Sequence, residues 1–217
     1  NSVAPKIVSS ELLAGQNWSV AITPNDGLLD GETKYSNNLT VLSLGPLGTS
    51  GNPFLIYNCS DLNNTRNNLT AYYRLEQDIY CNVTGFNSGV GFVPLYVFAG
   101  NFNGSNKLIY NLYINNSGNV GLFDSTQTTF SVYNLGLVNV DITGTTYAGS
   151  FCGNECQGNF TQVFSTGKVF GTTESGGLIG RCNNRCDINN SYSRANASSP
   201  GNRAGGLLGA SNVGIIT

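Results

Sequence analysis

The fold is predicted from the motif Ser175-Gly176-Gly177-Leu178-Ile179-Gly180, because close copies of it recur through the last two thirds of the chain. The other copies are Asn119-Val120-Gly121-Leu122-Phe123, Ala148-Gly149-Ser150-Phe151 and Ala204-Gly205-Gly206-Leu207-Leu208-Gly209. Counted at the second small position, Gly121, Gly149, Gly177 and Gly206 are separated by 28, 28 and 29 residues. Internal repeats of roughly 20 to 50 residues indicate a solenoid, a propeller or a repeat array.

A second segment repeats in step with the first. Its copies are Asn134-Leu135-Gly136-Leu137, Gln162-Val163-Phe164-Ser165 and Asn190-Ser191-Tyr192-Ser193, which are 28 residues apart in both intervals. Each repeat contains short β-type runs, Phe130–Val132, Leu137–Ile142 and Gln162–Phe170, and none has a helical period of useful length. We therefore predict an all-β solenoid with turns of about 28 residues.

Successive turns of such a solenoid stack strand on strand at roughly 4.8 Å, so equivalent side chains form columns along the axis. The predicted core columns are Phe123, Phe151, Ile179 and Leu208, and Leu122, Ser150, Leu178 and Leu207. A further column contains Asn134, Gln162 and Asn190. These amides are expected either to form a hydrogen-bonded ladder or to occupy solvent-exposed turn corners.

The repeated motifs resemble the GLUG repeat of secreted and cell-surface proteins. The resemblance rests on Gly-Gly-Leu-Ile-Gly at 176–180 followed by Asn-Ser-Tyr-Ser at 190–193, and on a similar lead-in at 73–79, 98–104 and 108–114. It extends from Tyr72 to Thr217. It implies a right-handed parallel β-helix of the kind found in adhesins, large surface proteins and the non-catalytic regions of immunoglobulin-A-specific metallopeptidases. The resemblance implies a scaffold and carries no catalytic residue.

The first 70 residues do not follow the repeat register. Four strands are predicted there, Lys6–Leu13, Trp18–Ile22, Leu39–Leu44 and Phe54–Tyr57, and the polar segment Asn63–Thr70 is predicted as a boundary loop. Residues 1–70 are expected to form either a separate small β domain or irregular first turns that cap the solenoid, and residues 71–217 the β-helix.

Cysteines and glycosylation motifs predict an extracellular protein. The six cysteines are an even number with paired spacings: Cys59, Cys81, Cys152, Cys156, Cys182 and Cys186. Eleven Asn-x-Ser/Thr motifs are candidate N-glycosylation sites: Asn17, Asn38, Asn58, Asn63, Asn68, Asn82, Asn103, Asn115, Asn159, Asn189 and Asn196. Together they indicate a secreted, disulfide-bonded glycoprotein.

The pairing of the four C-terminal cysteines is left open by the spacing. They can close local loops as 152–156 and 182–186, or join neighbouring turns as 152–182 and 156–186. The local pairing is favoured because the two loops are out of register with the repeat, and Cys59 and Cys81 are then expected to join the N-terminal region to the first turn. A zinc site is not expected, because the spacing is Cys-x-x-x-Cys and the chain contains no His.

The sequence offers little for catalysis. Absence of His excludes Ser-His-Asp and Cys-His chemistry, and the remaining enzyme hypothesis is polysaccharide cleavage by paired carboxylates. The candidate carboxylates are Asp78, Asp124, Asp141, Glu155, Glu174 and Asp187. Candidate sugar-stacking rings are Tyr110, Tyr113, Tyr133, Tyr147 and Tyr192. No cofactor or metal is expected.

Composition excludes further classes of partner. The formal net charge of -2 provides no basic patch for nucleic acid, and no run of 18 or more apolar residues is present to span a membrane. The chain begins at Asn1 without Met, so we expect a removed signal peptide or a fragment. The apolar stretch Val213–Thr217 is expected to require a covering partner or further repeats.

These observations predict a non-enzymatic, extracellular structural glycoprotein that assembles with itself head to tail into a filament or surface fibre. The alternative is a glycan- or cell-binding adhesin domain of a longer surface protein. A polysaccharide-cleaving β-helix enzyme is the third hypothesis.

Overall fold

The computed structural model describes residues 16–40, 47–183, 185–201 and 203–212, and the backbone of 214–216. The chain divides into two compact units, Asn1–Pro46 and Leu47–Thr217. In the first unit two short antiparallel pairs form a hairpin: β1 (Asn17–Trp18) with β4 (Leu39–Thr40), and β2 (Ala21–Ile22) with β3 (Lys34–Tyr35). The predicted strand Lys6–Leu13, like the end of Leu39–Leu44, lies outside the described residues.

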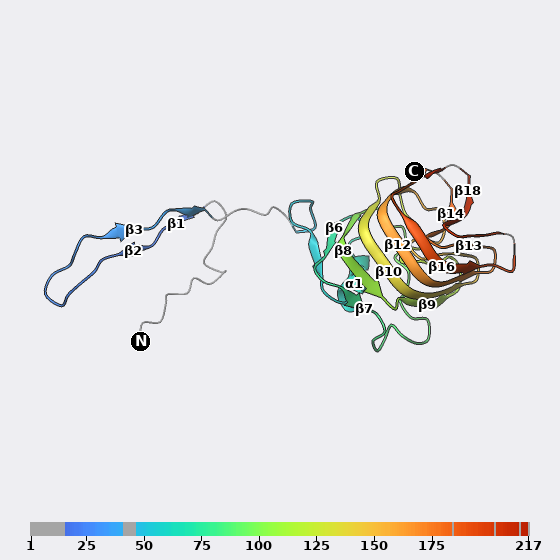
Figure 1. Cartoon of the computed structure of the whole chain (residues 1–217), viewed down its shortest axis with the longest axis horizontal. Coiled ribbons are helices and arrows are strands. Elements are labelled where there is room, and N and C mark those ends of the chain that lie inside the picture. Colours follow the sequence, from blue (N-terminus) through green and yellow to red (C-terminus); the bar gives the residue numbers. More distant parts are fainter. Residues whose placement is uncertain (1–15, 41–46, 184, 202, 213, 217) are drawn as a thin grey trace. The chain divides into compact units, whose positions relative to one another are not determined.

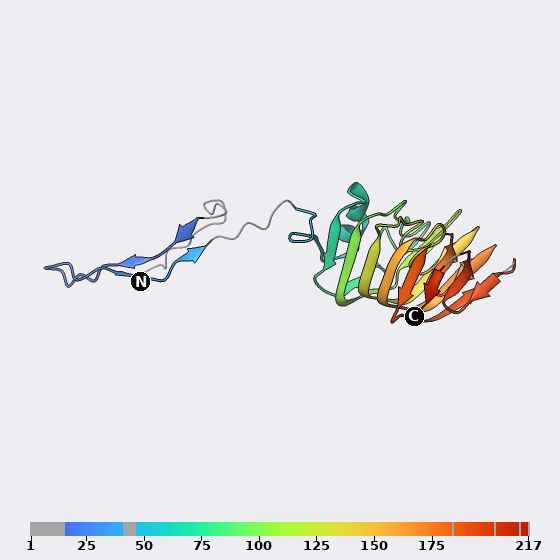
Figure 2. The same cartoon turned by 90° about the horizontal axis from the view of Figure 1, so that it is seen from above.

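The second unit is a parallel β-solenoid of about five turns of about 28 residues, as the sequence predicts. Figure 2 shows the strands of successive turns lying side by side along it. Its largest sheet has the strand order β19-β15-β12-β10-β8-β6-β5, with β7, β9 and β16 attached. These strands are β5 (Phe54–Ile56), β6 (Tyr72–Leu75), β7 (Ile79–Tyr80), β8 (Asn101–Tyr110), β9 (Tyr113–Asn116), β10 (Ser131–Gly144), β12 (Gly158–Gly171), β15 (Cys186–Asn189), β16 (Tyr192–Ser198) and β19 (Gly214–Ile216).

Two smaller parallel sheets complete the later turns. One has the order β11-β13-β17 and the other pairs β14 with β18. Their bounds are β11 (Tyr147–Gly149), β13 (Glu174–Gly176), β14 (Ile179–Cys182), β17 (Arg203–Gly205) and β18 (Leu208–Ser211). Isolated parallel bridges such as Leu95 to Phe123 and Val120 to Ala148 continue the same stacking into the earlier turns.

Residues 47–70 belong to the solenoid unit, so the division of the chain lies after Pro46 rather than after residue 70. β5 pairs in parallel with β6 at the edge of the large sheet. The predicted boundary loop Asn63–Thr70 is instead largely helical, because α1 (Cys59–Asn64) runs into a 3-10 helix at Thr65–Asn67. Asn58 caps α1 by accepting a hydrogen bond from the Asp61 amide, which offsets the low helix propensity of this polar segment.

The interior of the solenoid is a continuous apolar core with aromatic rings at its centre. Phe123 lies 4.9 Å from both Phe98 and Phe130, and Phe130 lies 5.1 Å from Phe160, measured between ring centroids. The first five predicted core residues, Leu122, Phe123, Phe151, Leu178 and Ile179, are fully buried. The last two, Leu207 and Leu208, are half-buried and pack against the core.

The predicted register of the core columns is wrong by one residue at one turn. Cys152, not Phe151, bridges to both Phe123 and Ile179, and Gly149 pairs with Gly176 rather than Gly177. In this register Gly149 and Gly153 of one turn align with Gly176 and Gly180 of the next. The pairing of Leu137 with Ser165, and of Ser165 with Ser193, keeps the predicted interval of 28 residues.

The amide column forms the corners of the solenoid. Asn134, Gln162 and Asn190 have positive φ angles of 56°, 53° and 51°, the left-handed conformation that Asn tolerates better than most residues. A hydrogen-bonded amide ladder occurs at the next corner instead, where Asn139 Nδ2 donates to Asn111 Oδ1 at 2.7 Å. The repeated Asn in this protein therefore marks a sharp bend.

Candidate functional site

The glycine motif makes a narrow arch between two strands of the same turn. A Cβ atom on Gly176 would lie 2.6 Å from the Gly209 amide nitrogen, and closer still to the Ile179 carbonyl oxygen. Only glycine permits this approach of two backbones. The arch sets β13 beside β14, so Glu174 of β13 lies near Arg181 of β14.

A charged cluster occupies this junction. The Glu174 side chain is only 2% exposed and pairs with Arg203 of the next turn, with 3.0 Å between Glu174 Oε1 and Arg203 Nη2. Arg181 of β14 lies 3.9 Å from Glu174 Oε2 through Nε, and its Nη1 donates to the Tyr147 hydroxyl at 2.8 Å. Tyr147, Glu174 and Arg203 occupy equivalent positions in three consecutive turns, so the cluster joins these turns along the axis.

The sequence identified Glu174 and Tyr147 separately but not this cluster. A uniform 28-residue repeat does not align these residues, because β11, β13 and β17 pair at intervals of 27 and 29 residues. Two arginines lie within ion-pair distance of the buried carboxylate, and Tyr147 holds one of them, Arg181, from the neighbouring turn. The arrangement is typical of a structural ion-pair network.

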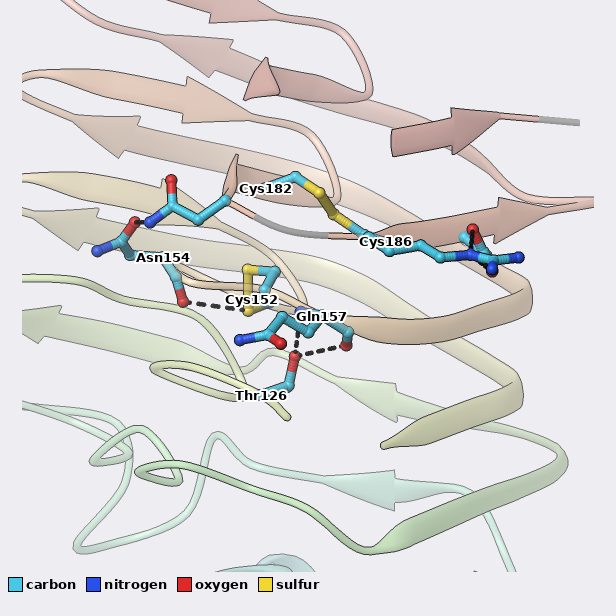
Figure 3. Close-up of a disulfide and its surroundings, with 10 residues drawn as sticks. Thr126, Cys152, Asn154, Gln157, Cys182 and Cys186 are labelled. Atoms are coloured by element: carbon cyan, nitrogen blue, oxygen red, sulfur yellow. Dashed lines mark hydrogen bonds and ion pairs between the residues drawn. A yellow bond between two sulfur atoms is a disulfide. The ribbon is translucent and has the colours of Figure 1, made fainter. Parts of the chain in front are cut away.

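The disulfides have the local pairing that the sequence favours. Cys152 pairs with Cys156 and Cys182 with Cys186, with Cα atoms 6.0 and 6.1 Å apart. Figure 3 shows both bridges in successive turns, beside the hydrogen bonds between Thr126 and Gln157. The third bridge joins Cys59 in α1 to Cys81 after β7, and it fixes the N-terminal helix to the first turn. Among the described cysteines none is free.

The candidate glycosylation sites all lie at the surface of their units. Asn63, Asn103 and Asn189 are half-buried, and the other eight asparagines are exposed. Asn103 and Asn189 belong to the outward row of the large sheet that also contains Tyr133 and Thr161. Surface position is necessary for attachment of a glycan, but occupancy stays a prediction.

The candidate carboxylates are dispersed, with one exception. Burial raises the pKa of Asp124, and the charge of Glu155 raises it further. A hydrogen bond with Ser125 acts in the opposite direction and lowers this pKa. These two carboxylates, from successive turns, are therefore close enough to interact. Elsewhere Asp187 is bound by Arg185 at 2.9 and 3.1 Å, and Asp78 accepts a hydrogen bond from the Leu108 amide.

Aromatic rings pair on the outer surface of the large sheet. Tyr80 stacks on Tyr110 with 4.7 Å between ring centroids, and Phe164 stacks on Tyr192 with 5.2 Å. The Arg194 guanidinium lies 5.6 Å from the Tyr192 ring centroid. Stacking along the axis covers one face of each ring and leaves ring edges toward solvent. Of the other predicted rings, Tyr147 belongs to the charged cluster, and Tyr113 donates to the Gly89 carbonyl oxygen at 3.3 Å.

Within the described residues no group of three or more His, Cys, Asp or Glu side chains is arranged to hold a metal ion. None of the helices described has the length and apolar content of a membrane-spanning segment.

Comparison with known proteins adds one relative. The chain is 34% identical over 175 residues to halomucin of Haloquadratum walsbyi (strain DSM 16790 / HBSQ001), in an alignment that covers 75% of this chain. The matched region spans 2% of halomucin's own length. No protein-family model matches the sequence, so membership in the GLUG family stays a prediction. No solved structure matches it.

Proposed function

We propose that this protein is a non-enzymatic structural glycoprotein of the cell surface or extracellular space. The observation that carries the proposal is the division of surface and interior: all eleven glycosylation motifs lie at the surface, and all six cysteines are paired. Disulfides persist in oxidising, extracellular compartments. The relative's name, halomucin, is that of a mucin, which agrees with such a setting.

The structural role is supported by how the outward side chains are used. The buried carboxylate Glu174 is held by arginines and the outer rings stack on one another, so these groups join successive turns. In this proposal the solenoid unit is a rigid rod. Parallel solenoids have strand edges at both ends, and association of unlike ends gives head-to-tail fibres.

The test of glycosylation and location is intact-mass measurement of the natively secreted protein before and after enzymatic removal of N-glycans. We expect a mass decrease, and peptide mapping is expected to assign glycans to exposed asparagines such as Asn82 and Asn115. Recovery of the unmodified chain from the cell interior, with reduced cysteines, would contradict the proposal.

A glycan-binding adhesin is the second candidate, and the outer aromatic pairs favour it. Tyr80 and Tyr192 are 56% and 49% exposed, and each ends a stacked pair. A sugar would stack on the face of Tyr80 that Tyr110 does not cover, or on Tyr192 by displacing the Arg194 guanidinium that lies over its ring. Calorimetric titration with polysaccharides is the test: the adhesin hypothesis expects binding that is lost in Tyr80→Ala or Tyr192→Ala, with exposed Tyr35→Ala as the control.

Polysaccharide cleavage is retained only for the Asp124 and Glu155 pair. Release of reducing sugar by the native protein, but not by Asp124→Asn, would overturn the non-enzymatic proposal. We expect no release from either protein.

A further inference from the structure

We propose that an N-glycan on Asn103 packs its first sugar on the ring of Tyr133, which lies one turn further along the solenoid. This inference rests on the proposed glycoprotein and adds the protein surface that one of its glycans contacts. Strand register, the hydrogen bonding of the glycosylation motif and the accessibility of the ring all favour the contact.

Asn103 and Tyr133 are neighbours on the outer face of the large sheet. They are register partners in the parallel pair of β8 and β10. The residues before them, Phe102 and Val132, are also partners and are fully buried in the core. Because side chains alternate between the two faces of a sheet, Asn103 and Tyr133 both point outward, from strands roughly 4.8 Å apart. A sugar attached to Asn103 therefore begins within reach of the Tyr133 ring.

The Asn103 side chain is held by its oxygen, and its nitrogen stays available. Asn103 Oδ1 accepts a hydrogen bond from the amide of Ser105, the third residue of the glycosylation motif, at 2.8 Å. Asn103 Nδ2, the atom to which an N-glycan is attached, donates no hydrogen bond within the described part of the chain. The hydrogen bond that orients this amide is therefore compatible with the glycan.

β8 has a bulge that begins directly after Asn103. Leu135 pairs with Lys107, so β8 has two more residues than β10 in this interval. The middle residue of the motif is glycine at this bulge, and a Cβ atom on Gly104 would lie 2.6 Å from the Leu135 Cα. Ser105 follows with a positive φ angle of 51°. The bulge and the hydrogen bond from Ser105 together orient the Asn103 amide before any sugar is attached, which lowers the entropy cost of packing that sugar.

The Tyr133 ring is accessible to a sugar. Of the five candidate sugar-stacking rings, the other four contact another ring, an arginine or a backbone carbonyl oxygen. Tyr133 is half-buried and has neither a ring partner nor a hydrogen bond among the described residues. The next residue in its row is Thr161, which has a small side chain. The apolar C–H face of a pyranose would pack on the exposed part of the Tyr133 ring.

A second glycosylation motif lies near the same ring, but the register favours Asn103. Asn159 pairs with Ser131, so it is a diagonal neighbour of Tyr133 and not a direct one. Diagonal neighbours in a sheet are roughly 7 Å apart, against roughly 5 Å for direct neighbours. Asn159 therefore provides the competing assignment that the experiment must exclude.

The experiment compares melting temperatures of the full chain in two forms. One form is secreted from a glycosylating host, and the other is made without glycans in a bacterial periplasm, where disulfides form. Ser105→Ala removes the motif but keeps the backbone hydrogen bond to Asn103, and Tyr133→Ala removes the ring. In the glycosylated form each substitution is expected to lower Tm by roughly 2 to 4 °C more than in the unglycosylated form. The double variant is expected to lose no more of this extra stability than either single variant.

The matched control is Ser198→Ala, which removes the motif at Asn196. Asn196 is exposed in β16, and its register partner is Lys168, which offers no ring. Loss of this motif is expected to shift Tm by less than about 1 °C, with or without Tyr133→Ala. Peptide mapping of each preparation reports which asparagines carry sugar.

Each outcome separates this inference from the proposed glycoprotein. Glycans at other motifs with a bare Asn103 would refute the inference and leave the glycoprotein standing. Additive effects of Ser105→Ala and Tyr133→Ala in a chain that carries sugar at Asn103 would do the same. Coupling of Tyr133→Ala with Asn159→Gln, and not with Ser105→Ala, would also refute it. A secreted chain without sugar at any motif would refute both.

Discussion

Alanine at Gly176 is expected to destabilise the solenoid strongly, and alanine at Gly206 is not. At Gly176 the new methyl group would lie 2.6 Å from the Gly209 nitrogen and closer to the Ile179 carbonyl, so two backbone strands of the arch must separate. Overpacking against backbone of this kind costs about 3 kcal/mol. At Gly206 no atom lies within 4 Å of the added methyl group. There the lower entropy of the unfolded chain is expected to raise stability by about 0.5 kcal/mol.

The assay is thermal unfolding followed by circular dichroism, with the two variants and the native chain at equal concentration. For a domain of this size, about 3 kcal/mol corresponds to a fall in Tm of roughly 6 to 12 °C. Gly206→Ala is expected to stay within about 2 °C of the native protein. Equal Tm values for the two variants would refute the arch as the reason for the repeated glycine.

Further substitutions test other contacts by the same melting assay. Replacing Cys59 and Cys81 by alanine should lower the free energy of unfolding by about 3 kcal/mol, and replacing Cys152 and Cys156 should lower it by about 2 kcal/mol. The first loss is larger because the first bridge closes the longer loop. A larger loss for the second pair would contradict this reasoning. Glu174→Gln should cost about 1 to 3 kcal/mol, discounted because Arg203 is more than half exposed, while Glu32→Gln in the exposed pair with Lys34 should cost almost nothing. Burial raises the pKa of Asp124, so ionising this carboxyl in the native state costs stability at pH values above the ordinary aspartate pKa. Asp124→Asn should therefore be more stable than the native chain at pH 7, and this advantage should vanish near pH 3, where the carboxyl is protonated in both states. An advantage that persists at low pH would point to packing instead.

The repeat period was sufficient to predict the solenoid and its later strands. The aligned pairs Leu137 with Ser165, and Ser165 with Ser193, follow from the 28-residue interval, because stacked turns of equal length place equal positions together. The local disulfide at Cys152 was also predictable, since its loop is out of register with the next one.

Other features depend on turn-by-turn irregularities that a mean period averages out. One turn is 27 residues between Ala148 and Ser175 and the next is 29 between Ser175 and Ala204, which moves Phe151 out of its predicted column and creates the cluster at Glu174. The helix α1 escaped prediction because its sequence is polar. Its stability comes from the Asn58 cap and from burial of Leu62, not from a visible helical period.

The most direct test of the account is electron microscopy of the natively purified, glycosylated protein without added ligand. Head-to-tail assembly predicts filaments with one subunit per axial repeat of roughly 25 to 30 Å, which is the length of about five turns stacked at 4.8 Å with a small allowance for the contact. Dispersed single rods at high protein concentration and low salt would contradict it.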